Sequence, residues 1–319
     1  MIQNLIKHII QAILFTLSNK WIPSFVFSIK AFKRLFDFGW KLLVSGLINT
    51  LYRNVYYVII GRFFSATSLG YYTNANKLKT TASSSITAAI QKVSYPVLSK
   101  LKSDNEKLKK GYQKIIKNSV YLIFPAMIGL AAIADPLIPF LFGNNWIESI
   151  PYFQILCFAG MIYPLHAINL NILKVKGRSD LFLGLEIFKK IIAAIFIGLV
   201  VYFKIGIIGL LLVSVFNSYI GYFINSYFSA NLLSYSTFEQ IKDIFPAFIL
   251  SLIMGLVVVF IKDYLPNIIY IRLVLQIIIG MGLYVLLSKL FKVDEFNTIL
   301  DLLKGLIKSS NNKLSNNEN

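Results

Sequence analysis

The sequence predicts an all-α polytopic membrane protein with eight transmembrane helices and a partial helix before them. Of its 319 residues, 56% are hydrophobic and only 14% are charged, which is more apolar surface than the cores of one or two soluble domains can bury. Apolar runs long enough to cross a bilayer recur between polar, proline and glycine interruptions. Basic residues gather in alternate connections, the pattern that orients membrane proteins.

The first apolar segment is short. Residues 6 to 21, IKHIIQAILFTLSNKW, have a brief apolar middle and no small-residue cleavage pattern after it, which favours a partial or capping helix over a removed signal peptide. We expect residues 1–34 to form this helix and a cytoplasmic linker, and residues 35–305 to form a transmembrane bundle. Residues 306–319 are polar and of low complexity, and we expect them to be disordered.

The remaining spans alternate in orientation. They are expected at residues 36–60, 73–97, 119–141, 151–173, 181–203, 206–229, 244–261 and 270–290. On one side of the membrane the flanking segments hold twenty lysines and arginines, including seven in the loop expected at 98–117. The other side holds three, Arg62, Lys204 and Lys262. This asymmetry places the basic loops and the C-terminus in the cytoplasm.

Residues 73–97, TNANKLKTTASSSITAAIQKVSYPV, form the most polar span. Unpaired polar groups in lipid each cost several kcal/mol, so one face should meet water. At 100 degrees per residue that face holds Lys77, Thr81, Ser84, Thr87, Gln91 and Ser94, opposite Leu78, Ala82, Ile86, Ala89, Val93 and Val97. A helix lying flat at the interface is the alternative. The charge alternation requires a crossing here, and the polar face is mostly uncharged, so we favour a cavity wall.

The preceding span carries a polar stripe of its own. The stripe consists of Ser45, Asn49, Tyr52, Arg53 and Tyr56. Arg53 lies 17 residues beyond the cytoplasmic start at residue 36, too deep to reach that surface easily at about 1.5 Å per residue. A cation at this depth indicates a substrate or ion path, unless it extends outward past Tyr57. Lys92, in the next span, could serve the same cavity or reach the cytoplasmic headgroups.

A third charged group begins the run LEIFKKIIAAIFIGLV, residues 185–200. Glu186 precedes Lys189 by three residues and Lys190 by four, the favoured order for ion pairs within a helix. Lys189 lies roughly 12 Å from the cytoplasmic end of its span. Its long side chain can extend toward the membrane surface and cover part of that distance. The three residues form either an inner-leaflet anchor, which this distance slightly favours, or part of a charged cytoplasmic vestibule.

Other polar residues are weaker candidates. His166 follows Pro164 in an apolar span, where a lone histidine is more often a hydrogen-bonded structural residue than a proton carrier. Asn169 and Asn171 could bind substrate or cross-link helices. Cys157, the single cysteine, lies in an apolar run and is expected to be a small buried hydrophobe.

The sequence lacks the motifs of the common enzyme and cofactor classes. It has no GxGxxG, P-loop, HExxH, CxxC or nucleophile elbow, and two distant histidines with one cysteine do not make a metal site. The net charge of +18 is spread over loops rather than gathered on one soluble face, so nucleic acid is not an expected partner. We therefore expect a protein that is not an enzyme and uses no cofactor or metal.

Three stretches carry a resemblance to a known family. Residues 151–190, PYFQILCFAGMIYPLHAINLNILKVKGRSDLFLGLEIFKK, together with residues 35–78 and 93–115, resemble bacterial oligosaccharide flippases. These are the polysaccharide transport branch of the MOP exporter superfamily, which includes lipopolysaccharide and O-antigen biosynthesis proteins. The resemblance covers residues 20 to 305.

The resemblance implies a transporter of fourteen helices in two pseudo-symmetric bundles, related to MATE proteins. Such transporters move an undecaprenyl-diphosphate-linked oligosaccharide from the cytoplasmic to the outer leaflet of the bacterial plasma (inner) membrane by alternating access. Residues 36–60 and 73–97 would be the first two helices of the second bundle. The residues expected in the cavity are Arg53, Lys77 and Lys92 for the diphosphate, Asn49, Ser84 and Gln91 for sugar hydroxyls, and Tyr56 in the wall.

With eight helices, the chain lacks the first bundle, for which residues 1–20 are at most a remnant. Because a site between two bundles cannot alternate with one of them, we expect a truncated or split transporter, or less simply a homodimer. Two other functions stay open. A cation-coupled multidrug antiporter would need a deep unpaired carboxylate, and a membrane glycan polymerase or ligase would need a large outward loop with arginine and histidine chemistry.

Overall fold

The computed structural model describes residues 2–19 and 27–301. The chain divides into two compact units, residues 1–40 and 41–319. The first unit holds α1 (Ile2–Asn19) and the start of α2 (Ile29–Phe63). The expected disordered tail, residues 306–319, lies outside the described residues.

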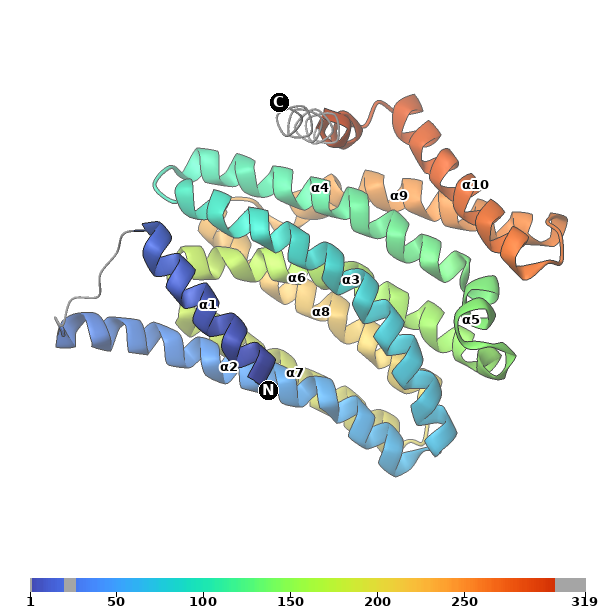
Figure 1. The fold of residues 1–319 in the computed structure, drawn as a ribbon, viewed down its shortest axis with the longest axis horizontal. Helices are drawn as coiled ribbons and strands as arrows, with labels where there is room; N and C mark the ends of the chain where they lie inside the picture. The colour runs from blue at the N-terminus through green and yellow to red at the C-terminus, as the bar shows by residue number, and fades with distance from the viewer. Residues whose placement is uncertain (1, 20–26, 302–319) are drawn as a thin grey trace. The chain divides into compact units, whose positions relative to one another are not determined.

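The second unit contains the rest of α2 and a series of further helices (Figure 1). The long helices are α3 (Ala66–Lys100), α4 (Asn105–Ala132), α6 (Ile150–Val175), α7 (Ser179–Tyr202), α8 (Ile207–Leu233), α9 (Thr237–Ile261) and α10 (Ile269–Leu290). Shorter elements are α5 (Ala134–Phe142) and the 3-10 helices η1 (Asn144–Ser149) and η2 (Lys262–Tyr264). The described residues form no strand, and the all-α prediction is confirmed.

Each predicted span except 119–141 falls on its own long helix, but the helices differ in how apolar they are. Among the described residues, five are long and apolar enough to cross a membrane by themselves: α4, α6 with η1, α8, α9 with η2, and α10. The chain is therefore a multi-pass membrane protein. The other three, α2, α3 and α7, carry the polar stripes and the charged group that the sequence singles out. The total of eight spans stays a prediction.

The span predicted at 119–141 is wrong at its end, because it crosses the break between α4 and α5. Here α4 begins at Asn105 and ends at Ala132, and α5 follows as a separate short helix. Pro136, which lacks an amide hydrogen to donate to the carbonyl of residue 132, accounts for the break. The loop expected at 98–117 is mostly helical, because the Asp104 carboxylate caps α4 by accepting a hydrogen bond from the Lys107 amide at 3.1 Å. This backbone hydrogen bond also lowers the pKa of Asp104.

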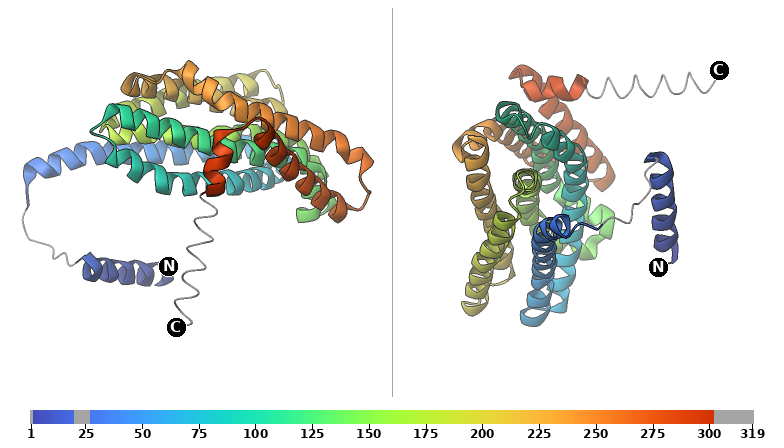
Figure 2. Two further views of the ribbon diagram at one scale, coloured as in Figure 1. Left: turned by 90° about the horizontal axis from the view of Figure 1, so that it is seen from above. Right: turned by 90° about the vertical axis from the view of Figure 1, so that its left-hand side faces the viewer.

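Helix α6 is the centre of the second unit. It packs against α3, α4 and α8, and the two views in Figure 2 show it enclosed by them. Phe153, Leu156 and Leu165 of α6 are fully or almost fully buried. Cys157 is 1% exposed, which confirms its predicted place in the apolar interior.

The face that α3 presents to α6 differs from the predicted one. Ser83, Thr87 and Ser94 are buried in this contact, whereas the sequence placed Thr87 and Ser94 on an open polar face with Lys77. The prediction of a single wet face is therefore wrong. Small side chains allow two helix backbones to approach closely in a membrane protein, and their size outweighs their polarity here.

Three polar residues tie α4, α6 and α8 together. The Tyr112 hydroxyl donates a hydrogen bond to Asn169 Oδ1 at 2.6 Å, and the Ser229 hydroxyl donates to the same oxygen at 2.5 Å. All three residues are fully buried. Of the two roles that the sequence left open for Asn169, cross-linking of helices is the one observed. Asn171 makes a longer contact to Ser94 on α3, at 3.5 Å.

We predict that Asn169→Ala destabilises the protein, because Tyr112 and Ser229 lose their shared acceptor. The expected loss is about 1–2 kcal/mol, measured as a lower unfolding midpoint of the purified protein in detergent. Asn231→Ala, which removes an exposed amide from α8, is the matched control. Equal midpoints for the two variants would contradict this role for Asn169.

Candidate functional site

The charged residues of α7 are buried within the helix bundle. Glu186 is 2% exposed, and its carboxylate pairs with Lys189, one turn away, and with Lys190 at 3.9 Å. The lysine side chains are themselves 11% and 24% exposed. A membrane anchor would extend such side chains to the surface. The interpretation of this group as an inner-leaflet anchor is therefore wrong, and the group belongs to the interior.

Helix α2 forms one wall of this group. Lys190 Nζ lies 4.1 Å from the centroid of the Tyr52 ring, a cation–π contact. The hydroxyl oxygens of Tyr52 and Tyr56 are 3.3 Å apart, and Asn49 lies against the Glu186 carboxylate. The polar stripe predicted on α2 thus faces α7.

Arg53 lies at the edge of this wall. Its side chain is exposed, but its charge is close enough to Lys190 for the two to interact. Lys189, Lys190 and Arg53 against the single carboxylate of Glu186 leave two net positive charges at one place. We call these four residues the cationic cluster.

Helices α6 and α8 form the opposite wall. The Asn225 amide nitrogen lies 3.1 Å from His166 Nδ1. A Cβ added at Gly221 would come within 3.0 Å of His166 Cε1 and 3.4 Å of Lys189 Cδ. A residue without a side chain at position 221 is therefore what lets the histidine and the lysine stem cross α8.

Two amides of α8 have buried polar atoms with no hydrogen bond of good geometry within the described part of the chain. They are the whole amide of Asn217, which lies beside the Tyr52 and Tyr56 hydroxyls, and Oδ1 of Asn225. Leaving such groups unpaired is costly. The site therefore offers hydrogen bonds to a ligand or to water.

The residues predicted on α3 lie apart from the cationic cluster. Lys77, Gln91 and Lys92 are exposed and Ser84 is half-buried, and in the described part of the chain none of them has a hydrogen bond or ion pair with the cluster. The structure joins the predicted residues of α2 to those of α7, and it leaves the predicted residues of α3 on a separate surface.

A different lysine of α3 turns inward. The stem of Lys79 crosses α6 at Gly160, where an added Cβ would lie 3.0 Å from both Cγ and Cδ of the lysine. It has no hydrogen bond or ion pair among the described residues. Sequence reasoning missed Lys79 because it weighed the polar face of α3 by residue type, and Lys79 lies on the seam of small residues.

Sequence reasoning also missed the residues of α8, although a signal was present. Asn217, Gly221 and Asn225 recur every four residues in a helix with no charged residue, which places them on one face. His166 was noticed, but its partner was not.

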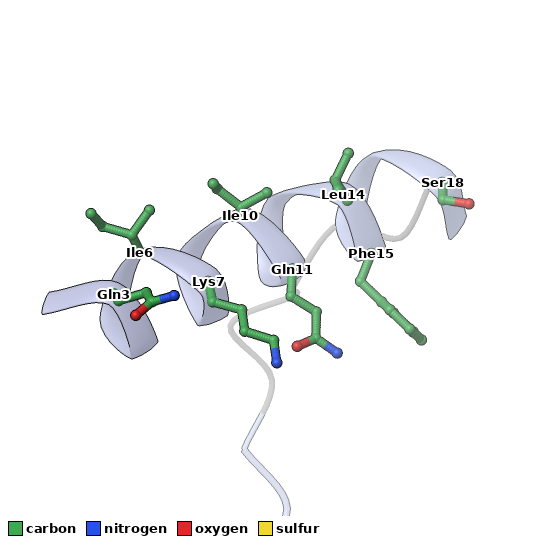
Figure 3. Close-up of a pocket in the computed structure, with 8 residues that line it drawn as sticks. All are labelled: Gln3, Ile6, Lys7, Ile10, Gln11, Leu14, Phe15 and Ser18. Atoms are coloured by element: carbon green, nitrogen blue, oxygen red, sulfur yellow. The ribbon is translucent and has the colours of Figure 1, made fainter. Parts of the chain in front are cut away.

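A separate hollow follows α1 (Figure 3). Its lining residues are Gln3, Ile6, Lys7, Ile10, Gln11, Leu14, Phe15 and Ser18. All of them come from this one helix, so the hollow is a helix surface and not an enclosed site.

A bundle of long membrane helices with net positive charge held between them is typical of a membrane transport protein.

Comparison with known proteins identifies relatives that are named for polysaccharide biosynthesis and transport. Residues 1–151 match the polysaccharide biosynthesis protein family. The teichuronic acid biosynthesis protein TuaB of Bacillus subtilis is 34% identical over 163 residues, which are 51% of this chain and 34% of that protein. The lipopolysaccharide biosynthesis protein WzxC of Escherichia coli is 29% identical over 205 residues, 63% of this chain and 42% of that protein.

The fold also matches a solved structure. The lipid II flippase MurJ in its inward closed conformation aligns with a TM-score of 0.63 at 19% identity, over 85% of this chain and 57% of that chain.

A third relative by sequence is the succinoglycan biosynthesis transport protein ExoT of Rhizobium meliloti, which is 25% identical over 147 residues, 46% of this chain and 30% of that protein.

These matches confirm the resemblance found in the sequence: the chain is related to membrane proteins of polysaccharide biosynthesis and transport. They also support the prediction that it is not an enzyme, because the relatives include a named transport protein. The chain spans less than half the length of TuaB or WzxC.

We predict that Glu186→Gln destabilises the protein by about 3 kcal/mol, because it leaves two lysines buried without a counter-charge. Adding Lys189→Gln should restore part of the loss, since one of the two uncompensated charges is then gone. Unfolding midpoints of the single and double variants measure both effects.

The matched control is Asp180→Asn, which neutralises an exposed carboxylate on the same helix and should have little effect. If Glu186→Gln and Asp180→Asn behave alike, the carboxylate of Glu186 does not neutralise buried lysines.

We further predict that Gly221→Val displaces His166 and Lys189, since even a Cβ at this position approaches the histidine ring to 3.0 Å. Gly282→Val on α10, where a Cβ has open space, is the control. The measurement is the NMR chemical shift of the labelled His166 ring, with His8 as the internal reference. An unmoved His166 signal in Gly221→Val would show that the ring does not lie over this glycine.

Proposed function

We propose that the chain is the C-terminal helical bundle of a flippase. It would move an undecaprenyl-diphosphate-linked oligosaccharide from the cytoplasmic to the outer leaflet during cell-surface polysaccharide biosynthesis. The observation that carries this proposal is the cationic cluster, with its two net positive charges, held between α2 and α7. Residues 35–305 would form the bundle, in the bacterial plasma (inner) membrane, with the C-terminus in the cytoplasm as the basic loops predict.

The charge of the cluster suits an anionic headgroup. Arginine and lysine are the side chains that bind phosphate oxygens most strongly, by charge-assisted hydrogen bonds. Glu186 pairs with both Lys189 and Lys190 while no substrate is present, so neither lysine is buried without a carboxylate beside it, although one positive charge of the two stays uncompensated. A diphosphate entering the site would supply the negative charge in place of the carboxylate, and the lysines could then turn toward it.

Polar groups beside the cluster could receive the sugars. Asn49 lies against the Glu186 carboxylate, and the amide of Asn217 lies beside the hydroxyls of Tyr52 and Tyr56. The predicted sugar contacts Ser84 and Gln91, and the predicted phosphate contacts Lys77 and Lys92, lie on α3, mostly exposed. We propose that these α3 residues meet the substrate along the other wall of the transport path.

Alternating access requires a second wall that moves against the first. We propose that another helical bundle completes the transporter around the exposed faces of α2 and α3. The 57% coverage of the MurJ fold agrees with a chain that forms one part of such a transporter.

The charge distribution favours this function over a cation antiporter. An antiporter needs a carboxylate that can bind and release a cation, but Glu186 is already paired with two lysines. The excess charge of the site is positive, which repels a cationic drug and attracts a diphosphate.

The direct test is complementation of a flippase-deficient bacterial strain, with surface polysaccharide as the readout. The chain is expressed alone and together with the part of its relative TuaB that lies outside the aligned residues. Restored polysaccharide in either case supports the proposed function, and rescue that needs the added part also supports the second wall. No rescue in either case, with both polypeptides present in the membrane, counts against the proposal.

We predict that Lys190→Ala and Arg53→Ala each abolish rescue, because each removes a cation that the diphosphate needs. Lys110→Ala, which removes an exposed lysine from α4, should rescue as well as the unaltered chain. Surface polysaccharide is measured at equal membrane levels of each variant. Full rescue by Lys190→Ala and Arg53→Ala would show that the cationic cluster is not used for transport.

A further inference from the structure

An apolar groove runs between α2 and α7. Its volume is about 490 Å³, and it is lined by α2 residues that include Val55, Ile59 and Phe63 and by α7 residues that include Ala194, Gly198 and Val201. The spacing of three to four residues on both helices means that each contributes one continuous stripe. From Val55 to Phe63 the groove extends about 12 Å along α2.

One end of the groove meets the cationic cluster. Tyr52 lines the groove and also holds Lys190 at 4.1 Å from its ring. Lys190 lies one turn before Ala194 on the same stripe of α7. The surface therefore passes without interruption from positive charge into an apolar channel, which is the complement of an amphiphile with an anionic head.

The middle of the groove is open because two of the α7 residues that line it, Ala194 and Gly198, are small. Ala194 and Gly198 are both exposed, and a Cβ placed at Gly198 would have no atom within 4 Å. Larger side chains at these two positions would fill the space between the helices.

We propose that this groove binds the isoprenoid chain of the lipid-linked substrate, at the units next to the diphosphate. The proposal rests on the proposed function, because it takes the cationic cluster as the headgroup site. The first isoprene units are covalently joined to the diphosphate, so they must lie within a few ångströms of the cations that bind it. The groove is the apolar surface that begins there.

This placement gives the substrate a definite orientation. With the head at Lys190 and the tail along α2 and α7, the saccharide on the other side of the diphosphate points toward Asn49, one turn before Tyr52 on α2. The isoprenoid then stays at the side of the bundle while the polar part of the molecule enters it.

The test uses a geranylgeranyl diphosphate that carries a diazirine on its tail, photolysed with the full chain in phosphatidylcholine nanodiscs. Mass spectrometry locates the adducts. We expect them on residues 55–63 of α2 and 194–201 of α7, and we expect their loss in Gly198→Leu, whose side chain occupies the groove. Gly184→Leu is the matched control, since Gly184 is also on α7, is exposed and has open space around its Cβ position, but does not line the groove.

Unchanged thermal unfolding of both variants establishes that each has folded. Adducts elsewhere, or adducts that persist in Gly198→Leu, would overturn the groove assignment. Equal displacement of the probe by phosphatidylglycerol and by unlabelled geranylgeranyl diphosphate would overturn the isoprenoid as occupant and indicate a phospholipid acyl chain.

A second probe separates this proposal from the proposed function. The diazirine analogue of geranylgeraniol has the same tail but no diphosphate. If it labels the groove as strongly as the diphosphate does, and Gly198→Leu still abolishes labelling, the groove assignment stands and the headgroup role of the cationic cluster fails. If labelling needs the diphosphate and is lost in Lys190→Ala, both proposals are supported.

Discussion

The pairing of Glu186 with Lys189 and Lys190 is the interaction on which the organisation of the site depends. A single charge buried between membrane helices is costly, and the pairing keeps three charged side chains close together at a tolerable cost. It also fixes how the neighbouring helices must be built. A glycine at position 221 makes room for the lysine stem, Tyr52 covers Lys190, and Asn49 meets the carboxylate.

The bundle around this pair uses polar residues in two different ways. In the contacts of α6 with α3, α4 and α8, serine, threonine and asparagine are buried and help the helices approach and connect. Between α2, α7 and α8, some buried polar atoms have no close hydrogen bond to any residue that the structure describes, and positive charge is in excess. The first arrangement holds the helices together, and the second is suited to bind something that enters from outside.

Helix α2 is joined to the rest of its unit mainly by long aromatic side chains. Tyr56 stacks on Tyr72, with ring centroids 6.3 Å apart, and Tyr57 accepts a hydrogen bond from Asn76 at 2.8 Å. Such contacts hold two helices at a greater separation than a seam of small residues does. The apolar groove between α2 and α7 is open instead where α7 has the small residues Ala194 and Gly198. Tyr52 lines this groove and also contacts Lys190, so the groove and the cationic cluster occur on the same helix pair.

The sequence by itself determined the class of protein, the existence and order of the long helices, and the polar stripe of α2, because apolar length and helical periodicity are local properties of the chain. It also identified Glu186, Lys189 and Lys190 as partners, since their spacing places them on one helical face. Only the tertiary structure decided which way these side chains point, which face of α3 is buried, and that Lys79, Asn217 and Asn225 turn inward. Those outcomes depend on how closely the backbones of neighbouring helices approach each other. Small residues such as Gly221 and Ser83 set that distance, and their effect falls on residues in other parts of the chain.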